Sequence, residues 1–135
     1  MDYTSLEDAY RVAKESRLKA HAPYSNFFVG AALKVKGVDE LIPGCNVENI
    51  SFGGTICAER NAIISSVAHY GKQEFEYMVI VCDTKPLTVP CGMCLQVLAE
   101  FCPPEFPIHL GDMEGVKKSY QLRDLLPKVF DTINC

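Results

Sequence analysis

Hydrophobic residues recur at helical spacing in several segments of the chain. In the first segment, Thr4 and Glu7 form a capping box, and the helical spacing continues to about Ala20. In the second, Gly71 stands just after the last helical residue, where glycine commonly ends a helix. The third begins at Pro90, a residue suited to the first turn of a helix. The pattern predicts helices over residues 4–20, 57–70, 90–101 and 122–126.

Short apolar runs between these helices predict strands. Gly37 offers a turn between the first two runs, which are therefore expected to form a hairpin. A strand, a helix and a strand in succession after residue 78 form a crossover unit, which is right-handed in nearly all proteins. The predicted strands are residues 27–36, 41–47, 78–82, 106–110 and 116–120. This order of elements predicts an α/β fold in which helices cover a mixed sheet.

The length of the chain indicates how many domains it has, and its charge and hydropathy limit the classes of partner that it can bind. A chain of 135 residues is most simply one domain with a core of its own. Its net charge of −4 disfavours nucleic acid as a partner, because contacts with phosphates need a basic face. No apolar run approaches the roughly 20 residues that cross a membrane, so we expect no membrane partner.

The cysteines indicate a reducing compartment. The chain has 7 of them, an odd number, and it opens on the polar, acidic sequence Met1-Asp2-Tyr3-Thr4 rather than on the apolar stretch of a signal peptide. Clustered cysteines in a reducing compartment bind metal or react more often than they cross-link. We therefore expect a cytoplasmic protein.

Three of these cysteines and one glutamate form the strongest chemical signal. Cys91 and Cys94 lie at i and i+3 where a helix begins, so their sulfurs point to one side, and Cys57 opens another helix. Helix amino termini favour thiolate over thiol, and three thiolates hold Zn²⁺ with a fourth position free for water. Glu59 follows Cys57 by two residues, where a carboxylate can move the protons of that water. A closed structural site needs no such base, so the group predicts hydrolysis.

Other interpretations of the cysteines stay open. Cys91 and Cys94 have the spacing of a redox motif, although such motifs normally follow the first strand of their unit. A structural zinc site would take a fourth ligand from Cys45, Cys82 or Cys102. The cysteines can also be small buried hydrophobic residues.

Glu59 and the histidines have plain structural interpretations as well. An acidic residue in the first turn of a helix, such as Glu59, stabilises that helix by roughly a few tenths of a kcal/mol. The histidines, His21, His69 and His109, stand in unrelated contexts and are expected to be surface or packing residues.

Cys57-Ala58-Glu59 followed by the Pro-Cys-x-x-Cys element at residues 90–94 resembles the zinc signature of the cytidine deaminase superfamily. A cysteine before Ala58 is similar to the small deaminases of free nucleosides. The other segments that agree are Pro23-Tyr24-Ser25-Asn26-Phe27, Val29-Gly30-Ala31-Ala32-Leu33, Asn46-Val47-Glu48-Asn49 and Leu125-Leu126-Pro127. The resemblance implies a three-layer α/β/α sandwich with a mixed sheet of about five strands, a single domain over residues 1–135, and a homotetramer.

The resemblance also implies roles for individual residues. Cys57, Cys91 and Cys94 would be the ligands of the Zn²⁺ cofactor, and Glu59 would carry protons between water and substrate. The reaction would be hydrolytic deamination of cytidine and deoxycytidine to uridine and deoxyuridine, with release of ammonia, in pyrimidine salvage.

Substrate binding is assigned in the same way. Asn46 and Glu48 match the pair that binds the ribose hydroxyls, and Phe27 matches an aromatic that packs against the nucleoside. The backbone at Ala58 would read the base edge, and Phe130 matches a residue that reaches the base from a neighbouring subunit. Without the resemblance, core packing and strand-end positions would account for these residues.

Two departures from the family bear on the chemistry. Three thiolates on a dication leave one net negative charge, which weakens the metal as a Lewis acid. Arg60 is expected to compensate through charged hydrogen bonds to cysteine sulfur, whereas Leu95 stands where the family commonly has a second arginine. Phe52 replaces a common tyrosine.

Two other functions compete with cytidine deamination. A deaminase of a modified nucleoside or nucleoside antibiotic would share the zinc signature, but the intact sugar-binding pair argues against it. A non-catalytic zinc module would need no Glu59.

Overall fold

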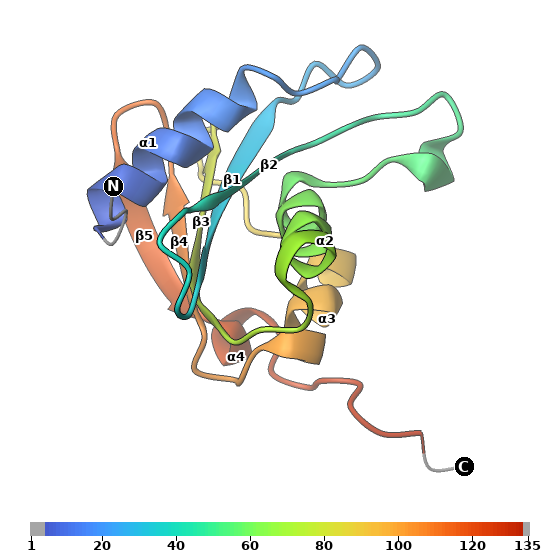
Figure 1. Cartoon of the computed structure of the whole chain (residues 1–135). Coiled ribbons are helices and arrows are strands. Elements are labelled where there is room, and N and C mark those ends of the chain that lie inside the picture. Colours follow the sequence, from blue (N-terminus) through green and yellow to red (C-terminus); the bar gives the residue numbers. More distant parts are fainter. Residues whose placement is uncertain (1–4, 134–135) are drawn as a thin grey trace.

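The computed structural model describes residues 5–133, which form a five-stranded mixed sheet between helices (Figure 1). The strands are β1 (Val29–Val35), β2 (Ile42–Cys45), β3 (Phe75–Cys82), β4 (Pro107–Gly111) and β5 (Val116–Gln121). Their order across the sheet is β2-β1-β3-β4-β5. Strands β3 and β4 pair in parallel, and the other neighbouring strands of this sheet pair antiparallel. The predicted mixed sheet of about five strands is confirmed.

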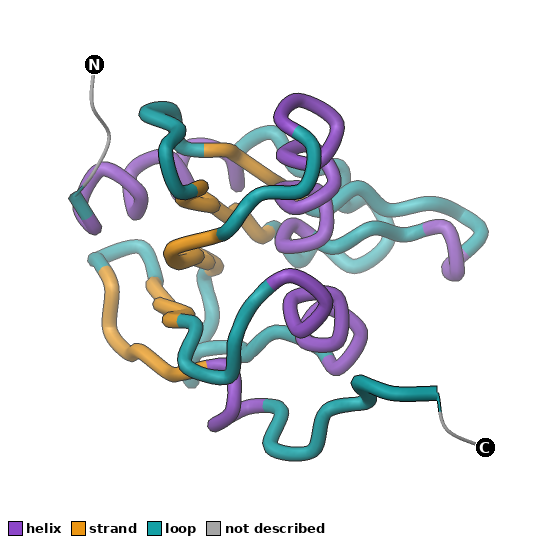
Figure 2. The backbone as a smooth tube through the Cα atoms, turned by 60° about the horizontal axis from the view of Figure 1, so that its bottom comes forward, coloured by secondary structure: helices purple, strands orange, loops and turns teal. Residues whose placement is uncertain are grey.

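The helices lie on both faces of this sheet, so the predicted three layers are confirmed (Figure 2). They are α1 (Leu6–Arg17), the short 3-10 helix η1 (Phe52–Gly54), α2 (Ala58–Tyr70), α3 (Gly92–Phe101) and α4 (Leu122–Leu125). Helix α1 packs on β1 and β3, where one apolar cluster forms around Ala9, Tyr10 and Val79. A larger cluster lies on the other face, beneath α2 and α3.

A glycine on β2 brings α2 close to the sheet. A Cβ on Gly44 would lie 2.3 Å from the carbonyl oxygen of Ala58 and 2.8 Å from the backbone nitrogen of Ala62. Any side chain at this position would therefore push the amino terminus of α2 away from β2. The absence of a Cβ lets the first turn of α2, which carries the predicted catalytic residue Glu59, lie close to the sheet.

Several predicted boundaries are wrong by a few residues. The side-chain oxygen of Ser5 accepts the capping hydrogen bond from the backbone N–H of Asp8, and Thr4 lies outside the described residues. Helix α1 ends at Arg17 because the next backbone N–H groups bond back to carbonyls three residues earlier. Strand β3 begins at Phe75, since it continues past the apolar run to pair with Val35.

Two helix features at the site also differ from expectation. Pro90 is not in the first turn of α3, because Cys91 is the N-cap and Gly92 the first helical residue. Likewise Cys57 is the N-cap of α2 rather than its first residue. Gly71 ends α2 as expected, with a φ of 72° that glycine adopts without strain.

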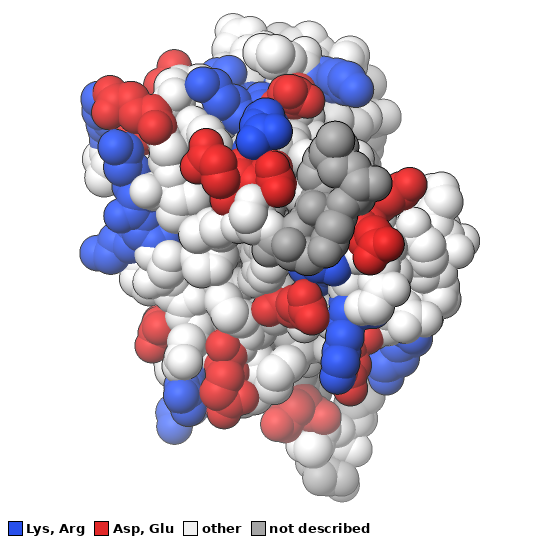
Figure 3. Space-filling view, turned by 60° about the vertical axis from the view of Figure 1, so that its left-hand side comes forward, with Lys and Arg blue, Asp and Glu red and all other residues white. Residues whose placement is uncertain are grey.

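The surface carries mixed charge. On the face shown in Figure 3, Lys and Arg side chains alternate with Asp and Glu. Across residues 5–133, no helix has both the length and the apolar character needed to cross a membrane.

Candidate metal and active site

The amino termini of two helices meet at the cysteine cluster. Cys57 and Cys91 are the N-caps of α2 and α3, and neither sulfur is used to cap its own helix. One sulfur atom from each of Cys57, Cys91 and Cys94 lies within 4.8 Å of the other two. The Cys91 and Cys94 sulfurs are 3.5 Å apart. The fold therefore brings together the three cysteines singled out in the sequence.

This donor set fits a zinc ion. Zn–S bonds of about 2.3 Å in a tetrahedral site place sulfurs roughly 3.8 Å apart, close to the spacing observed. Within residues 5–133, the cluster holds no fourth protein ligand, and Cys45, Cys82 and Cys102 are not part of it. Among the described residues a closed four-cysteine site is therefore not formed, and a tetrahedral ion held by these three sulfurs would keep one position for a water molecule.

The thiols of Cys57 and Cys94 have pKa values shifted in opposite directions. A hydrogen bond from Cys94 is the largest cause that lowers the pKa of Cys57 to about 5; burial opposes this shift and Arg60 assists it. The same hydrogen bond, with burial and the nearby charge of Glu59, raises the pKa of Cys94. A thiolate at Cys57 is thus already stabilised, and a dication would take the place of the proton that Cys94 shares with it.

Glu59 is enclosed beside the cluster. Its side chain is 5% exposed. Burial is the main cause that raises the pKa of this carboxyl, and the charge at Cys57 adds to the shift. A carboxylate whose pKa is raised toward neutrality accepts and returns a proton more readily than an exposed one. Its environment suits an acid–base role better than the stabilisation of a helix end.

Arg60 supplies the positive charge at the cluster. One guanidinium nitrogen, Nη2, donates to the Cys57 sulfur over 3.4 Å, and Nε is buried without a hydrogen-bond partner. Leu95 is only 5% exposed and belongs to the apolar cluster beneath α2 and α3. Leu95 therefore offers the sulfurs no charge, whereas Arg60 donates a charged hydrogen bond to the cluster.

Replacing Arg60 with alanine is expected to weaken zinc retention, and the catalytic activity that depends on it, by about tenfold to a hundredfold, the usual cost of losing a group that supports a metal ligand. The measurement is the zinc content after dialysis against a chelator, together with kcat/KM. Arg11→Ala is the control, because Arg11 is exposed and pairs with Asp8 far from the cluster. If the zinc content and kcat/KM of Arg60→Ala matched those of Arg11→Ala, Arg60 would have no role in supporting the metal ligands.

A cavity of about 290 Å³ opens beside the cluster. Its volume is close to the lower end of the range for small-molecule sites. The predicted substrate residues Phe27, Asn46, Glu48 and Ala58 line it together with Glu59. The fold therefore gathers residues that lie far apart in the sequence around one cavity.

Asn46 is already bonded to the backbone. Its amide nitrogen donates to the Phe27 carbonyl over 2.7 Å, and its amide oxygen accepts from the Val29 N–H over 2.9 Å. These bonds hold the start of β1 against the end of β2. Asn46 keeps one N–H and one lone pair for a ligand.

Glu48 is held by the loop before β1. One carboxylate oxygen accepts from the backbone N–H groups of Tyr24 and Ser25, each over 3.1 Å, and the other accepts from the Ser25 hydroxyl. The Ser25 hydroxyl is the largest cause that lowers the pKa of this carboxyl. Glu48 is therefore a fixed carboxylate at the cavity wall. The sequence did not predict this contact, although it singled out the Pro23-Tyr24-Ser25 segment by its resemblance to the family.

The structure does not bring Phe130 to this cavity. Its side chain is 69% exposed on the segment after α4, and its carbonyl accepts a hydrogen bond from the Gln96 amide over 2.8 Å. Conversely, the sequence did not indicate that Cys82 and Thr88 line the cavity. No local sequence pattern indicates that Cys82 lines the cavity, because its position there depends on the pairing of β3 with β1.

Comparison with known proteins identifies the family. The model of the family described as "Cytidine and deoxycytidylate deaminase zinc-binding region" matches residues 3–110. The chain belongs to this family. The cytidine deaminase of Halalkalibacterium halodurans is 41% identical over 118 residues, which cover 87% of this chain and 88% of that protein. That of Sporosarcina psychrophila is 39% identical over 125 residues, covering 93% and 90%.

Solved deaminase structures have the same fold. The cytidine deaminase of Burkholderia pseudomallei superposes with a TM-score of 0.87 at 39% identity, covering 94% of this chain and 100% of that one. Membership of a zinc-binding deaminase family agrees with the three-sulfur cluster, and the cofactor is Zn²⁺.

Proposed function

We propose that this chain catalyses the hydrolytic deamination of cytidine and deoxycytidine to uridine and deoxyuridine, with release of ammonia. The observation that carries the proposal is the single cavity in which a buried carboxyl, Glu59, lies beside three cysteine sulfurs. Polar groups suited to a sugar line the same cavity. Similarity to proteins named cytidine deaminase over most of the chain supports this substrate.

Glu59 carries the protons in this reaction. Cys57, Cys91 and Cys94 would hold Zn²⁺, which when bound would supply a water activated for attack on C4 of the base at neutral pH. Glu59 takes a proton from that water and gives one to N3 of the base. After the water oxygen has bonded to C4, Glu59 takes the remaining proton from that oxygen and gives it to the amino group, which leaves as ammonia while C4 becomes the carbonyl carbon of uridine. The raised pKa of Glu59 allows the same carboxyl to accept and donate.

The remaining cavity residues orient the nucleoside. Glu48 and Asn46 bind the sugar hydroxyls, each with the hydrogen-bonding capacity that their backbone contacts leave free. Phe27 packs against the nucleoside, and the backbone at Ala58, at the amino terminus of α2, reads the base edge. These roles hold C4 and N3 against the metal centre and Glu59.

Phe130 acts on the base of a neighbouring subunit in a homotetramer. This role is supported by its exposure on the segment after α4 and by its absence from the residues that line the cavity of its own chain. Residues 1–135 act as one catalytic domain in the cytoplasm, in line with the sequence arguments from length and cysteine content. The net charge of −4, and the mixture of Lys and Arg with Asp and Glu on the face shown in Figure 3, support a small nucleoside rather than nucleic acid as partner.

The purified protein tests this function directly. Incubation with cytidine should give uridine, followed as loss of ultraviolet absorbance, and one ammonia for each uridine. Removal of zinc with a chelator should stop the reaction, and addition of Zn²⁺ should restore it. Release of ammonia only from a modified nucleoside would favour the alternative deaminase, and no release from any nucleoside would favour a non-catalytic zinc module.

Replacing Glu48 with glutamine is expected to raise the KM for cytidine by about tenfold, since a charged acceptor for the sugar hydroxyls is lost. The measurement is KM and kcat for cytidine and for 2′,3′-dideoxycytidine. The dideoxy substrate is the control, because it has no ring hydroxyls for Glu48 to bind. An equal rise of KM for both substrates would show that Glu48 does not bind the sugar hydroxyls and only holds the loop of Tyr24 and Ser25 in place.

A further inference from the structure

Cys82 lines the catalytic cavity without belonging to the metal cluster. It is the last residue of β3 and is 3% exposed. In the pairing of β1 with β3 it lies directly opposite Val29, and both residues line the cavity. Its sulfur is absent from the group formed by Cys57, Cys91 and Cys94. Cys82 therefore forms part of the wall against which the substrate lies.

A short hydrogen-bonded chain supports this wall. The Cys82 sulfur lies 3.5 Å from the Thr84 hydroxyl, which lies 3.0 Å from the Thr88 hydroxyl. Thr88 and Val89 also line the cavity and lead through Pro90 to the N-cap of α3. The end of β3 and the segment before α3 thus form one continuous wall, defined here as the Cys82 wall (Cys82, Thr88, Val89).

The position of Glu59 indicates which edge of the base meets this wall. This step rests on the proposed function. In cytosine, C4 has two ring neighbours, N3 and C5. When C4 faces the metal centre and N3 faces Glu59 on α2, C5 points away from α2. Glu48 and Asn46 occupy the sugar end of the cavity, which leaves the Cys82 wall for the C5 edge.

We propose that the Cys82 wall sets the size of the substituent that the enzyme accepts at C5 of the pyrimidine. Cys82 is the side chain that determines this limit, because it is small, nearly buried and fixed on a central strand. A smaller side chain opens space beside C5, and a larger one fills it. Cys102 offers a matched comparison, since it ends α3 and lies outside the cavity.

The test measures kcat/KM for cytidine, 5-fluorocytidine, 5-methylcytidine and 5-bromocytidine in the zinc-loaded enzyme. For each variant, the ratio of each analogue to cytidine is divided by the wild-type ratio, which removes the intrinsic reactivity of the analogue. Cys82→Ala should raise the ratio for 5-bromocytidine about tenfold and change that for 5-fluorocytidine little. Cys82→Met should lower the ratio for 5-methylcytidine by about tenfold or more, as expected for one misplaced methyl group.

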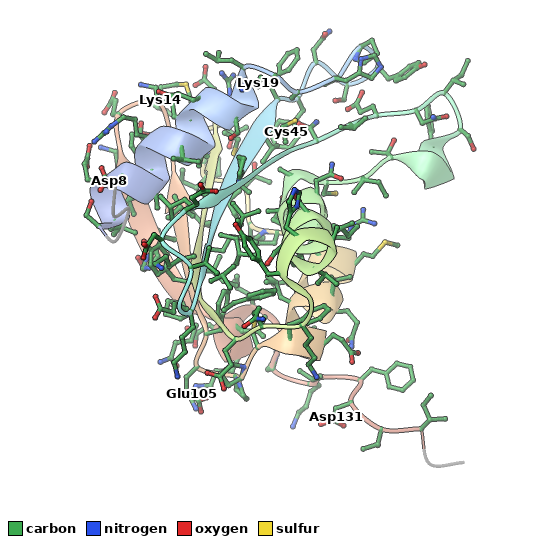
Figure 4. The ribbon with its side chains drawn as sticks, in the orientation of Figure 1. Asp8, Lys14, Lys19, Cys45, Glu105 and Asp131 are labelled. Carbon is green, nitrogen blue, oxygen red and sulfur yellow. The ribbon has the colours of Figure 1, made fainter. Side chains whose placement is uncertain are left out.

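Cys102→Ala is the control and should keep the wild-type ratios. Figure 4 shows Glu105, three residues after Cys102, at one end of the molecule, whereas Cys45 and Lys19 lie toward the other end. Ratios within twofold of wild type for Cys82→Ala, shown to be folded by its circular dichroism and zinc content, would overturn the proposal. Calorimetry with uridine and 5-bromouridine gives a second readout that needs no turnover. If Cys82→Ala binds 5-bromouridine more tightly than the wild-type protein does, relative to uridine, the size limit is supported. A wild-type protein that leaves cytidine unchanged would refute the proposed function but not the size limit.

Discussion

Replacing Glu59 with glutamine is expected to lower kcat for cytidine by about a thousandfold while the protein keeps its zinc. Glutamine has nearly the same shape but cannot accept or return a proton, and general acid–base catalysis contributes roughly 10²- to 10⁴-fold. Glu59 is buried beside Cys57, but it does not belong to the group of three cysteines that could hold the metal. The loss should therefore fall on the proton transfers and not on metal binding.

The experiment compares kcat and zinc content for wild type, Glu59→Gln and Glu100→Gln. Glu100 is an exposed residue of α3, so its replacement controls for the loss of one carboxylate elsewhere. The deaminase interpretation requires a collapse of ammonia release in Glu59→Gln alone, at one zinc per chain. If Glu59→Gln kept more than about a tenth of the wild-type kcat, Glu59 would not be the acid–base residue.

The metal cluster could be predicted from the sequence because its signals are local. A cysteine at a helix N-cap and another three residues later point to one side whatever the rest of the fold does. Cys91 and Cys94 follow this rule, and Cys57 opens α2 after the short η1 segment. Only the meeting of the two helix ends required the tertiary structure.

Other features depend on contacts between distant segments, which no local pattern contains. The length of β3 follows from its pairing with β1, which extends the strand to Phe75. Asn46 bonds to backbone groups at residues 27 and 29, and this fixed role was not visible in the sequence. The place of Cys82 in the cavity likewise follows from its register opposite Val29.

Replacing Cys94 with alanine is expected to weaken zinc binding by about a hundredfold or more and to abolish deamination with it. Its sulfur is one of three in the cluster and is fully buried, so its removal leaves the ion two cysteine sulfurs from this cluster. Because a bound metal stabilises the folded state by mass action, the melting temperature should also become insensitive to chelator.

Cys102→Ala separates metal loss from packing loss, because it removes a partly buried thiol from the same helix, two turns later. Both variants should lose some stability from the cavity left behind. Only Cys94→Ala should lose zinc and its response to chelator. If Cys94→Ala instead kept one zinc per chain and a melting temperature that fell on chelation, the ion would be held without this sulfur. The ligand set of Cys57, Cys91 and Cys94 would then be wrong, and the position assigned to water beside Glu59 would lose its structural basis.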